Sequence, residues 1–295
     1  MNNKERGLLL LTSHLGNPER KPMTVAQFRT LANRVSQMDK PTEIRDLTEA
    51  DMLALGYDSH AAHRIIALLS DDFLLDRYLQ IAKRQCCVPI TRVSECYPIS
   101  VRQRLGQDAP GCLWLKGDIS LLNDQTISLV GSRQLREPNR IFAETVGREV
   151  AIQGYTLVSG NARGADRIAQ DACLSAGGKV ISVIADSLEN YPIRDNVLYI
   201  SEEVFNQGFS AQRALSRNRV IHSLGYITIV AQCVLREGGT WDGTVKNLQN
   251  NWSPVFCFDD GSQAAVELTH RGANTVNMHQ LSNLAALKPD TKSFI

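Results

Sequence analysis

Two apolar, β-branched runs, each ending at small residues and followed by a helical pattern, constrain the fold most. They are Thr126–Arg133 (TISLVGSR) and Thr156–Asp166 (TLVSGNARGAD). A short, continuous apolar run that precedes a helix is typical of a buried parallel strand. The joint after such a strand lies at the carboxyl edge of the sheet, where a helix N-terminus presents unpaired N–H groups and a positive dipole end. The two joints therefore predict a phosphate-binding floor, with Arg133 and Arg163 supplying charge.

Strand–helix alternation continues through the rest of the C-terminal half. The expected strands are Thr126–Val130, Tyr155–Ser159, Val180–Ala185, Tyr226–Ala231 and Pro254–Phe258. The expected helices are Arg140–Gln153, Ala165–Ala176, Ala211–Leu224 and Thr240–Asn250. Alternation of this kind predicts an α/β fold with a mostly parallel, doubly wound sheet that carries helices on both faces.

The N-terminal part has a different period. Apolar residues recur at helical spacing from Met23 to about Leu105, and Thr48 is a plausible N-cap with Asp51 three residues later. The stretch Leu47–Leu69 reads as two helices joined near Gly56. Such a hairpin either contacts a nucleic-acid backbone through its turn or is a small packing module. The turn supplies no cation, which favours the packing module.

Composition limits the class of protein. A chain of 295 residues with a net charge of +1 can bind nucleic acid only through a local patch, because its charges balance overall. Seven cysteines without a CxxC pair fit a reducing cytoplasm and predict no metal site. The apolar run Leu8–Leu11 is too short for a secretory or membrane segment. We expect a cytoplasmic protein that does not associate with membranes.

Further candidate phosphate ligands follow later in the chain. Arginine suits phosphate because its planar fork donates two parallel hydrogen bonds, and glycine and threonine at a helix start add N–H and hydroxyl groups. In a doubly wound sheet these positions converge on one edge. The alternative is that these segments are tight turns whose arginines lie on the surface and bind no ligand. The candidate binding residues are Gly131, Ser132, Arg133, Ser159, Gly160, Asn161, Arg163, Gly164, Arg217, Asn218, Arg219, Gly239 and Thr240.

Nothing in the sequence indicates catalysis. No Ser/His/Asp or Cys/His constellation is evident, and the first joint lacks the GxGxxG spacing of a dinucleotide site. His222 lies among apolar residues, which favours a packing or hydrogen-bonding role. Asp166 is either a helix-capping carboxylate or a ribose ligand or general base. We therefore predict no catalytic residues and no cofactor.

Several motifs occur in the order and spacing of a known family. They are VGSR at 130–133, SGNARGAD at 159–166, YP at 191–192, RNR at 217–219 and GGTWDGT at 238–244. On these motifs the chain resembles the DprA/Smf family of DNA-processing proteins. The resemblance implies a helical domain over residues 1–110 similar to SAM or helix-hairpin-helix domains, an extended Rossmann-like domain over 111–282, and a tail over 283–295.

The resemblance also implies a function. Members of this family bind single-stranded DNA in a basic pocket, form dimers, and load the RecA recombinase during natural transformation or DNA recombination, without catalysis. Residues Ala214-Leu215 replace the Phe-Pro that usually precedes RNR, so an aromatic that could stack on a base is absent there. Departures of this kind suggest a divergent member, adapted to mobile-element or antiviral functions.

Two other functions remain open. The first is a nucleotide-binding sensor or phosphoribohydrolase-like Rossmann protein. Such hydrolases carry a glutamate just after a PGGxGT-like turn, whereas here Thr244 is followed by Val245 and Lys246, which argues against that chemistry. The second is an interaction protein whose pocket is vestigial, and which binds a recombinase or helicase partner without contacting nucleic acid.

Overall fold

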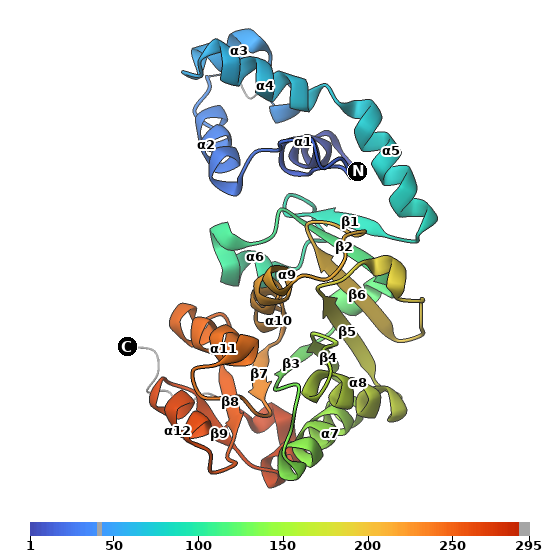
Figure 1. The fold of residues 1–295 in the computed structure, drawn as a ribbon, viewed down its shortest axis with the longest axis vertical. Helices are drawn as coiled ribbons and strands as arrows, with labels where there is room; N and C mark the ends of the chain where they lie inside the picture. Colours follow the sequence, from blue (N-terminus) through green and yellow to red (C-terminus); the bar gives the residue numbers. More distant parts are fainter. Residues whose placement is uncertain (40–42, 289–295) are drawn as a thin grey trace. The chain divides into compact units, whose positions relative to one another are not determined.

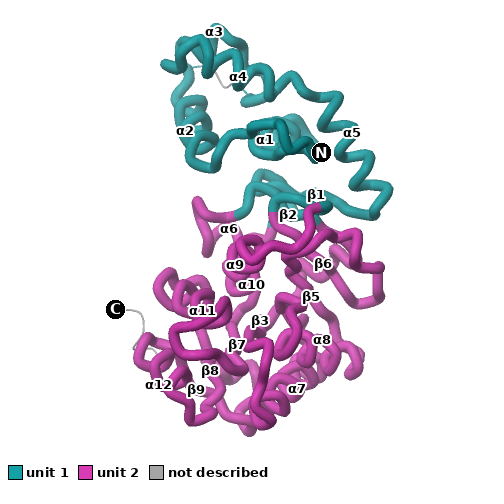
Figure 2. The backbone as a smooth tube through the Cα atoms, in the orientation of Figure 1, with its two compact units in different colours: residues 1–97, 110–114, 203–206 teal, residues 98–109, 115–202, 207–295 magenta. Residues whose placement is uncertain are grey.

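The computed structural model describes residues 1–39 and 43–288, which form two compact units (Figure 2). The first unit, here the helical unit, contains residues 1–97, 110–114 and 203–206. The second, here the sheet unit, contains residues 98–109, 115–202 and the chain from 207 onward. The predicted boundary at residue 110 stays a proposal, since short segments from later in the chain also belong to the helical unit.

The helical unit is built around a buried N-terminal helix that the sequence analysis left unassigned. Its helices are α1 (Asn3–Thr12), α2 (Val25–Val35), α3 (Glu49–Ala54), α4 (Ser59–Leu69) and α5 (Asp72–Arg84). The run Leu8–Leu11 on α1 is at most 2% exposed, and α1 packs against α2, α4 and α5. The apolar run is therefore part of the core of this unit, which explains why it contains no polar residue.

The predicted helical hairpin is present as α3 and α4. The Thr48 side chain accepts the Asp51 N–H and the Asp51 carboxylate accepts the Thr48 N–H, which is the capping box that the sequence predicts. Gly56 turns the chain with a φ of +80°, a conformation that favours glycine. The short strand β1 (Val88–Thr91) follows these helices, and Pro89 fits its position at the end of the strand order.

The sheet unit carries a parallel sheet. Its strands are β3 (Thr126–Val130), β4 (Thr156–Ser159), β5 (Lys179–Ile184), β6 (Val197–Glu202), β7 (Ile227–Val230), β8 (Val255–Phe258) and β9 (Asn274–Val276), while β2 (Cys112–Gly117) begins in the helical unit and ends here. The strand order within the sheet unit is β6-β5-β4-β3-β7-β8-β9, and the pairs among these strands are parallel. The predicted α/β class and parallel sheet are confirmed.

Helices cover both faces of this sheet. They are α6 (Ile99–Leu105), α7 (Glu137–Ile152), α8 (Ala165–Ser175), α9 (Ala211–Ser216), α10 (Asn218–Leu224), α11 (Gly238–Asn250) and α12 (Gln263–His270). Helices α7 and α8 pack together on one side of the strands, and α10 packs against α11 on the other (Figure 1). The rings of Phe142 on α7 and Phe258 on β8 stack with centroids 4.1 Å apart in the core beneath α7.

The order of the strands creates a switch point between β3 and β7. From β3 the chain winds outward through β4, β5 and β6, and it then returns to place β7 on the other side of β3, with Val130 beside Val230. In open α/β sheets, ligands bind outside the carboxyl ends of the strands where the winding direction reverses. The topology therefore points to the segments that follow β3 and β7.

The structure differs from the sequence prediction in several elements. The single helix expected over Ala211–Leu224 is two short helices, α9 and α10, which meet at Arg217. Strands β6 and β9 and helix α12 were not predicted. The expected tail begins inside a 3₁₀ segment, η5 (His279–Ala286), and its residues 289–295 lie outside the described chain. Over the described residues, no helix combines the length and the apolar character needed to span a membrane.

Candidate functional site

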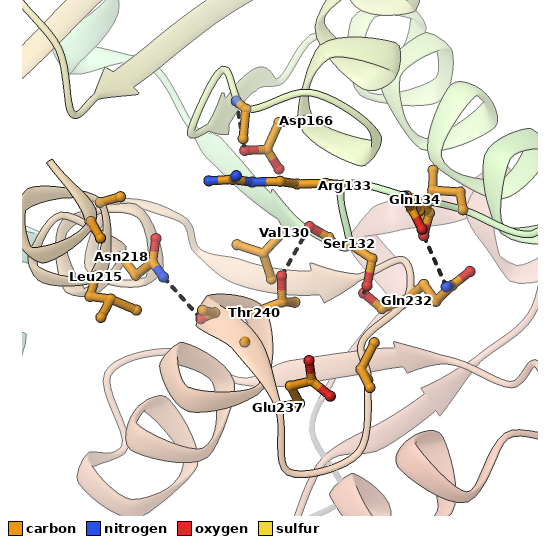
Figure 3. Close-up of a pocket in the computed structure, with 18 of the residues that line it drawn as sticks. Val130, Ser132, Arg133, Gln134, Asp166, Leu215, Asn218, Gln232, Glu237 and Thr240 are labelled. Atoms are coloured by element: carbon orange, nitrogen blue, oxygen red, sulfur yellow. Dashed lines mark hydrogen bonds between the residues drawn. The ribbon is translucent and has the colours of Figure 1, made fainter. Parts of the chain in front are cut away.

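A pocket of about 860 Å³ opens at the switch point, beyond the carboxyl ends of β3 and β7 (Figure 3). Its walls come from the joints after β3 and β4, the segment after β7, the stretch from Phe209 to Asn218, and the start of α11. In Figure 3 Asn218 and Leu215 lie on one side and Gln134 and Gln232 on the other, with Asp166 above and Glu237 below. A pocket of this size lies within the usual range for ligand sites.

The joint after β3 places an open arginine in this pocket. Gly131 allows the joint to pass close to α8, because a Cβ there would lie 2.4 Å from the Ala165 Cβ. The Ser132 N–H donates to the Gln232 carbonyl at 2.9 Å. Arg133 is exposed and its side chain extends across the pocket beneath Asp166 (Figure 3). Among the described residues, none forms an ion pair with Arg133, so its guanidinium can meet a ligand.

The N–H groups of the joint after β4 bind a carboxylate of the same joint. The Gly160 and Ala162 N–H groups donate to Asp166 Oδ2 at 3.1 and 3.2 Å, so the carboxylate closes its own loop. Asp166 is only 6% exposed, and burial raises its pKa, whereas the Arg217 charge and the two N–H groups act in the opposite direction. Both bonds come from the loop before α8, so Asp166 holds that loop, and neither bond caps an N–H group of the helix itself.

A buried arginine forms part of the pocket wall. Arg217 is 7% exposed and its guanidinium lies over Gly160, where a Cβ would come within 1.5 Å of Nη1. Burial lowers the pKa of Arg217, and the Asp166 carboxylate offsets part of that cost. Its Nε is buried without a hydrogen-bond partner among the described atoms. A buried cation whose hydrogen bonds are incomplete is suited to an anionic ligand.

The start of α11 contributes backbone donors. The first turn of a helix leaves N–H groups without intrahelical partners, and the N-cap Glu237 makes no side-chain capping bond. Gly238, Gly239 and Thr240 line the pocket at this point. The Thr240 hydroxyl donates to the Gly131 carbonyl at 2.9 Å, and Asn218 Nδ2 donates to the Gly239 carbonyl at 3.0 Å (Figure 3). These two bonds join the walls of the pocket to one another.

The structure brings together about half of the predicted binding residues. Those that line the pocket are Gly131, Ser132, Arg133, Arg217, Asn218, Gly239 and Thr240. Gly160 and Gly164 lie behind the wall, where Gly160 supports Arg217 and Gly164 approaches the Ser132 and Arg133 carbonyls. The buried Ser159 hydroxyl accepts a bond from Gln170 at 2.6 Å, and Asn161 lines a separate pocket of about 150 Å³ beside Tyr191.

Two predicted arginines do not join the pocket, which corrects the expected convergence. Arg163 is exposed on the loop after β4 and is not among the lining residues. Arg219 forms an ion pair with Glu202, whose carboxylate is 9% exposed and also accepts from Ser216. The expectation of free N–H groups at both sheet joints also needs correction, because Gln232 and Asp166 already accept N–H groups there.

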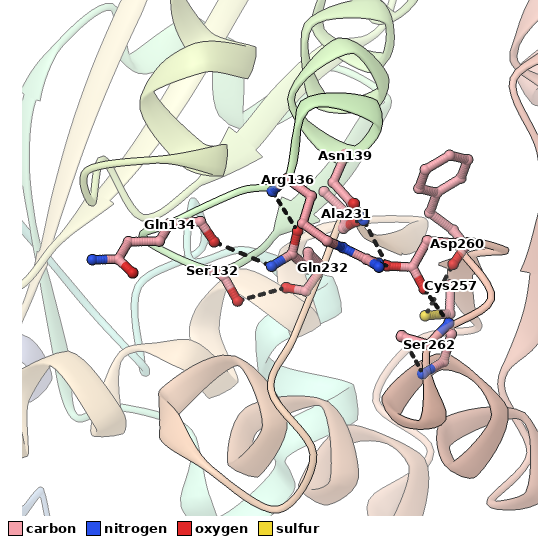
Figure 4. Close-up of polar contacts among 11 residues, drawn as sticks. Ser132, Gln134, Arg136, Asn139, Ala231, Gln232, Cys257, Asp260 and Ser262 are labelled. Atoms are coloured by element: carbon pink, nitrogen blue, oxygen red, sulfur yellow. Dashed lines mark hydrogen bonds and ion pairs between the residues drawn. The ribbon is translucent and has the colours of Figure 1, made fainter.

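A polar network that the sequence analysis missed holds the joint after β3 in place (Figure 4). The Arg136 N–H donates to Gln232 Oε1 at 3.0 Å, and its guanidinium pairs with Asp260. Asn139 donates to the Ala231 carbonyl at 2.8 Å and to Asp260 at 2.7 Å. Although burial alone would raise the pKa of Asp260, bonds from Ser262 and Asn139 lower it. Proline is common in the first turn of a helix, so Pro138 could have placed the start of α7, and with it Arg136 and Asn139, at the joint after β3.

His222, which lines the pocket, has a structural role. His222 is 1% exposed, and its Nδ1 accepts a bond from Asn247 Nδ2 at 3.1 Å. Burial lowers its pKa to about 3, so the ring is neutral near pH 7. This agrees with the hydrogen-bonding role predicted from the sequence. Within residues 1–39 and 43–288, no three His, Cys, Asp or Glu side chains cluster as metal ligands would.

Comparison with known proteins follows the same lines. The chain is 33% identical over 160 residues to DNA processing protein DprA of Streptococcus pneumoniae, a match that spans 50% of this chain and about half of that protein, 54%. The structure of the Streptococcus pneumoniae protein superposes with a TM-score of 0.69 at 23% identity, covering 98% of this chain and 99% of that one. DNA processing protein A of Helicobacter pylori, solved to study its binding of single-stranded DNA, gives 0.57 at 23% identity, covering 69% and 97%.

The match to a family model is wider than the 160-residue alignment with the Streptococcus pneumoniae protein. It covers residues 89–285, which contain the sheet, the pocket and the network around Asp260. The motifs that line the pocket therefore lie inside the matched region, in the order that the resemblance requires. This chain belongs to the DNA recombination-mediator protein A family.

Proposed function

We propose that this protein binds single-stranded DNA without catalysis and without reading its sequence, as part of DNA processing. The observation that carries the proposal is the pair of arginines in the pocket: Arg217 is buried with an unpartnered Nε, and Arg133 is open. In the proposal, both guanidinium groups and the N–H groups at the start of α11 hold phosphates. Contacts to a phosphodiester chain position a strand and carry no base information.

The charged residues of the pocket favour binding of a short segment of a DNA strand over binding of a long one. Arg133, Arg136 and Arg217 line the pocket together with Asp166 and Glu237. Arg136 and Asp166 already have partners within the fold. The net field is therefore local, in keeping with the balanced charge of the whole chain. The relative from Helicobacter pylori, which binds single-stranded DNA, has the same fold.

The proposal extends to partners. We propose that the chain acts with a RecA-like recombinase and as a homodimer, as the family resemblance implies, and that its role lies in DNA uptake or recombination, or in a mobile-element or antiviral pathway. Sedimentation of the protein alone tests the dimer. Stimulation of RecA assembly on a coated single strand tests the recombinase partner.

DNA binding is tested by fluorescence anisotropy with labelled single-stranded and duplex oligonucleotides at low and high salt. We expect single-strand affinity to fall with salt, by roughly 0.7 log unit per log unit of salt for each neutralised phosphate. Arg133→Ala removes one charged donor, so we expect a loss of roughly tenfold or more and a shallower salt slope. Mixed and homopolymeric strands should lose the same factor.

Arg163→Ala is the matched control, because it removes the same charge from a residue of the next joint that does not line the pocket. Its affinity should equal that of the unchanged protein. Equal losses in both variants would move DNA away from this pocket. A wild-type protein that fails to bind single strands at low salt, or that nucleoside monophosphates displace from them, would favour the nucleotide-binding alternative.

A further inference from the structure

The pocket has an apolar side that the phosphate contacts leave unused. Phe209, Leu215 and Val234 line it and are 60%, 50% and 50% exposed. Large apolar side chains exposed together in a pocket usually mark a surface that a ligand covers. Among the described residues that line this pocket, Phe209 is the only phenylalanine, tyrosine or tryptophan.

The backbone around Phe209 is anchored on both sides. The Arg213 guanidinium donates to the Gln207 carbonyl and to the Gly208 carbonyl at 2.9 Å, and also to Ser201 Oγ at 2.7 Å. On the other side, Ser210 caps α9 by accepting the Arg213 N–H at 3.1 Å. One arginine residue therefore fixes the chain immediately before and after Phe209. The exposed ring belongs to a tethered loop, as a binding platform requires.

The two kinds of lining residue together define the chemistry of the ligand. Arg133 and Arg217 call for an anion, whereas Phe209 and Leu215 call for a flat or apolar group within reach of that anion. An unpaired nucleotide offers both, because its base presents a free π-face beside its phosphate. In a duplex the faces of the bases are stacked on one another and cannot reach a protein ring without distortion.

We propose that Phe209 is a stacking platform for an unpaired base of the strand whose phosphates bind Arg133 and Arg217, and that it makes the pocket select single strands over duplex. This proposal rests on the proposed function and adds the residue that sets its specificity. Stacking of a base on an aromatic ring tolerates every base, so the platform adds affinity without sequence preference. Leu215 and Val234 would border the stacked base and exclude water.

The test compares a normal single strand, a strand of the same length with abasic sites, and a duplex. Phe209→Ala should weaken binding of the normal strand about 5- to 150-fold, the range measured for losing one base–aromatic stack. Its affinity for the abasic strand and for the duplex should not change, and its salt slope should equal that of the wild type. Phe209→Trp should retain normal-strand affinity, because a larger ring also stacks.

Phe73→Ala is the matched control, since Phe73 is 82% exposed and is not among the residues that line the pocket. It should leave binding unchanged. The proposal is overturned if Phe209→Ala weakens the normal and abasic strands equally, or weakens neither. Arg133→Ala distinguishes phosphate binding from base stacking, because it should weaken binding of the abasic strand as well. If Arg133→Ala has no effect on either strand, the proposed function itself fails.

Discussion

The joints after β3 and β4 are similar in sequence but differ in the contacts that they make. Both follow a buried strand, both contain glycine and serine, and both carry an arginine. The joint after β3 sends Arg133 into the pocket. In the joint after β4, the Gly160 N–H donates to Asp166, and the Arg217 guanidinium lies over Gly160. Arg163 in this joint is exposed on the surface.

The difference teaches that the second joint acts on the pocket through the first and through Arg217. The Ala165 N–H at the start of α8 donates to the Ser132 carbonyl at 3.2 Å, and Gly164 packs against the same backbone. In the proposed function, the joint after β3 contacts the ligand through Arg133, and the joint after β4 holds the first joint and Arg217 in position. Changes in the second joint should alter folding or the placement of Arg217, whereas Arg133→Ala should alter binding alone.

Gly164→Ala should produce the largest effect, on stability. A Cβ there would lie 2.5 Å from the Ser132 and Arg133 carbonyl oxygens, and φ is +91°, so neither the neighbouring backbone nor the residue itself can relax cheaply. Overpacking and a left-handed alanine together should lower the free energy of unfolding by about 2–5 kcal/mol. Urea denaturation measures this, with Gly208→Ala as the control because nothing lies within 4 Å of its Cβ position.

A Gly164→Ala protein within about 0.5 kcal/mol of the wild type would contradict the close approach of the two joints, since that range is typical of substitutions that touch nothing. The Gly208→Ala control also shows whether replacing any glycine by alanine changes the stability. Gly208 lies in an exposed segment, so its variant should unfold at the wild-type denaturant concentration.

Gly160→Ala should affect binding more than folding. Its Cβ would overlap the Arg217 guanidinium, which is the end of a flexible side chain and can move aside. We expect a stability cost of about 1–3 kcal/mol and a loss of single-strand affinity of roughly tenfold, as one charged phosphate contact is displaced. Anisotropy and denaturation on the same preparation measure both quantities.

A double variant shows whether this loss acts through Arg217. If it does, Gly160→Ala adds nothing to the binding loss of Arg217→Ala, because the side chain that it displaces is already absent. Additive losses would mean that the loop after β4 contacts DNA directly. That result would erase the distinction between the two joints.

The sequence predicted those parts of the fold and site that local patterns encode. Apolar runs and glycine-containing joints located β3, β4 and the helices after them, and strand–helix alternation predicted the doubly wound parallel sheet. Seven predicted binding residues line the pocket because each lies next to the carboxyl end of a strand or at the start of a helix, and the topology gathers such positions.

The remaining features depend on partners distant in the chain. Arg219 is paired because Glu202 ends β6, a strand that the sequence analysis did not assign. The same missed strand hid Phe209, which follows it in a loop that no periodic pattern marks. Helix α1 was missed because four consecutive leucines show no amphipathic period when every side of a helix is buried.

Asp166→Asn offers the finest test of the second joint, through pH. Burial raises the pKa of Asp166 above 3.8, so the folded protein binds this proton more tightly than the unfolded chain does. The resulting stability is fully present below pH 3.8 and is lost as pH rises through the folded-state pKa. The asparagine variant lacks this titration and can still accept the Gly160 and Ala162 N–H groups through its Oδ1.

Denaturation over a series of pH values should therefore show the wild type losing stability relative to Asp166→Asn as pH rises. Asp171→Asn, which removes an exposed carboxylate from the same helix, gives the baseline. The opposite slope would mean that attraction to Arg217 outweighs the burial of Asp166, and that the two form a bound charge pair. Arg217 would then be less available to a phosphate, and the second joint would limit the affinity of the pocket that it supports.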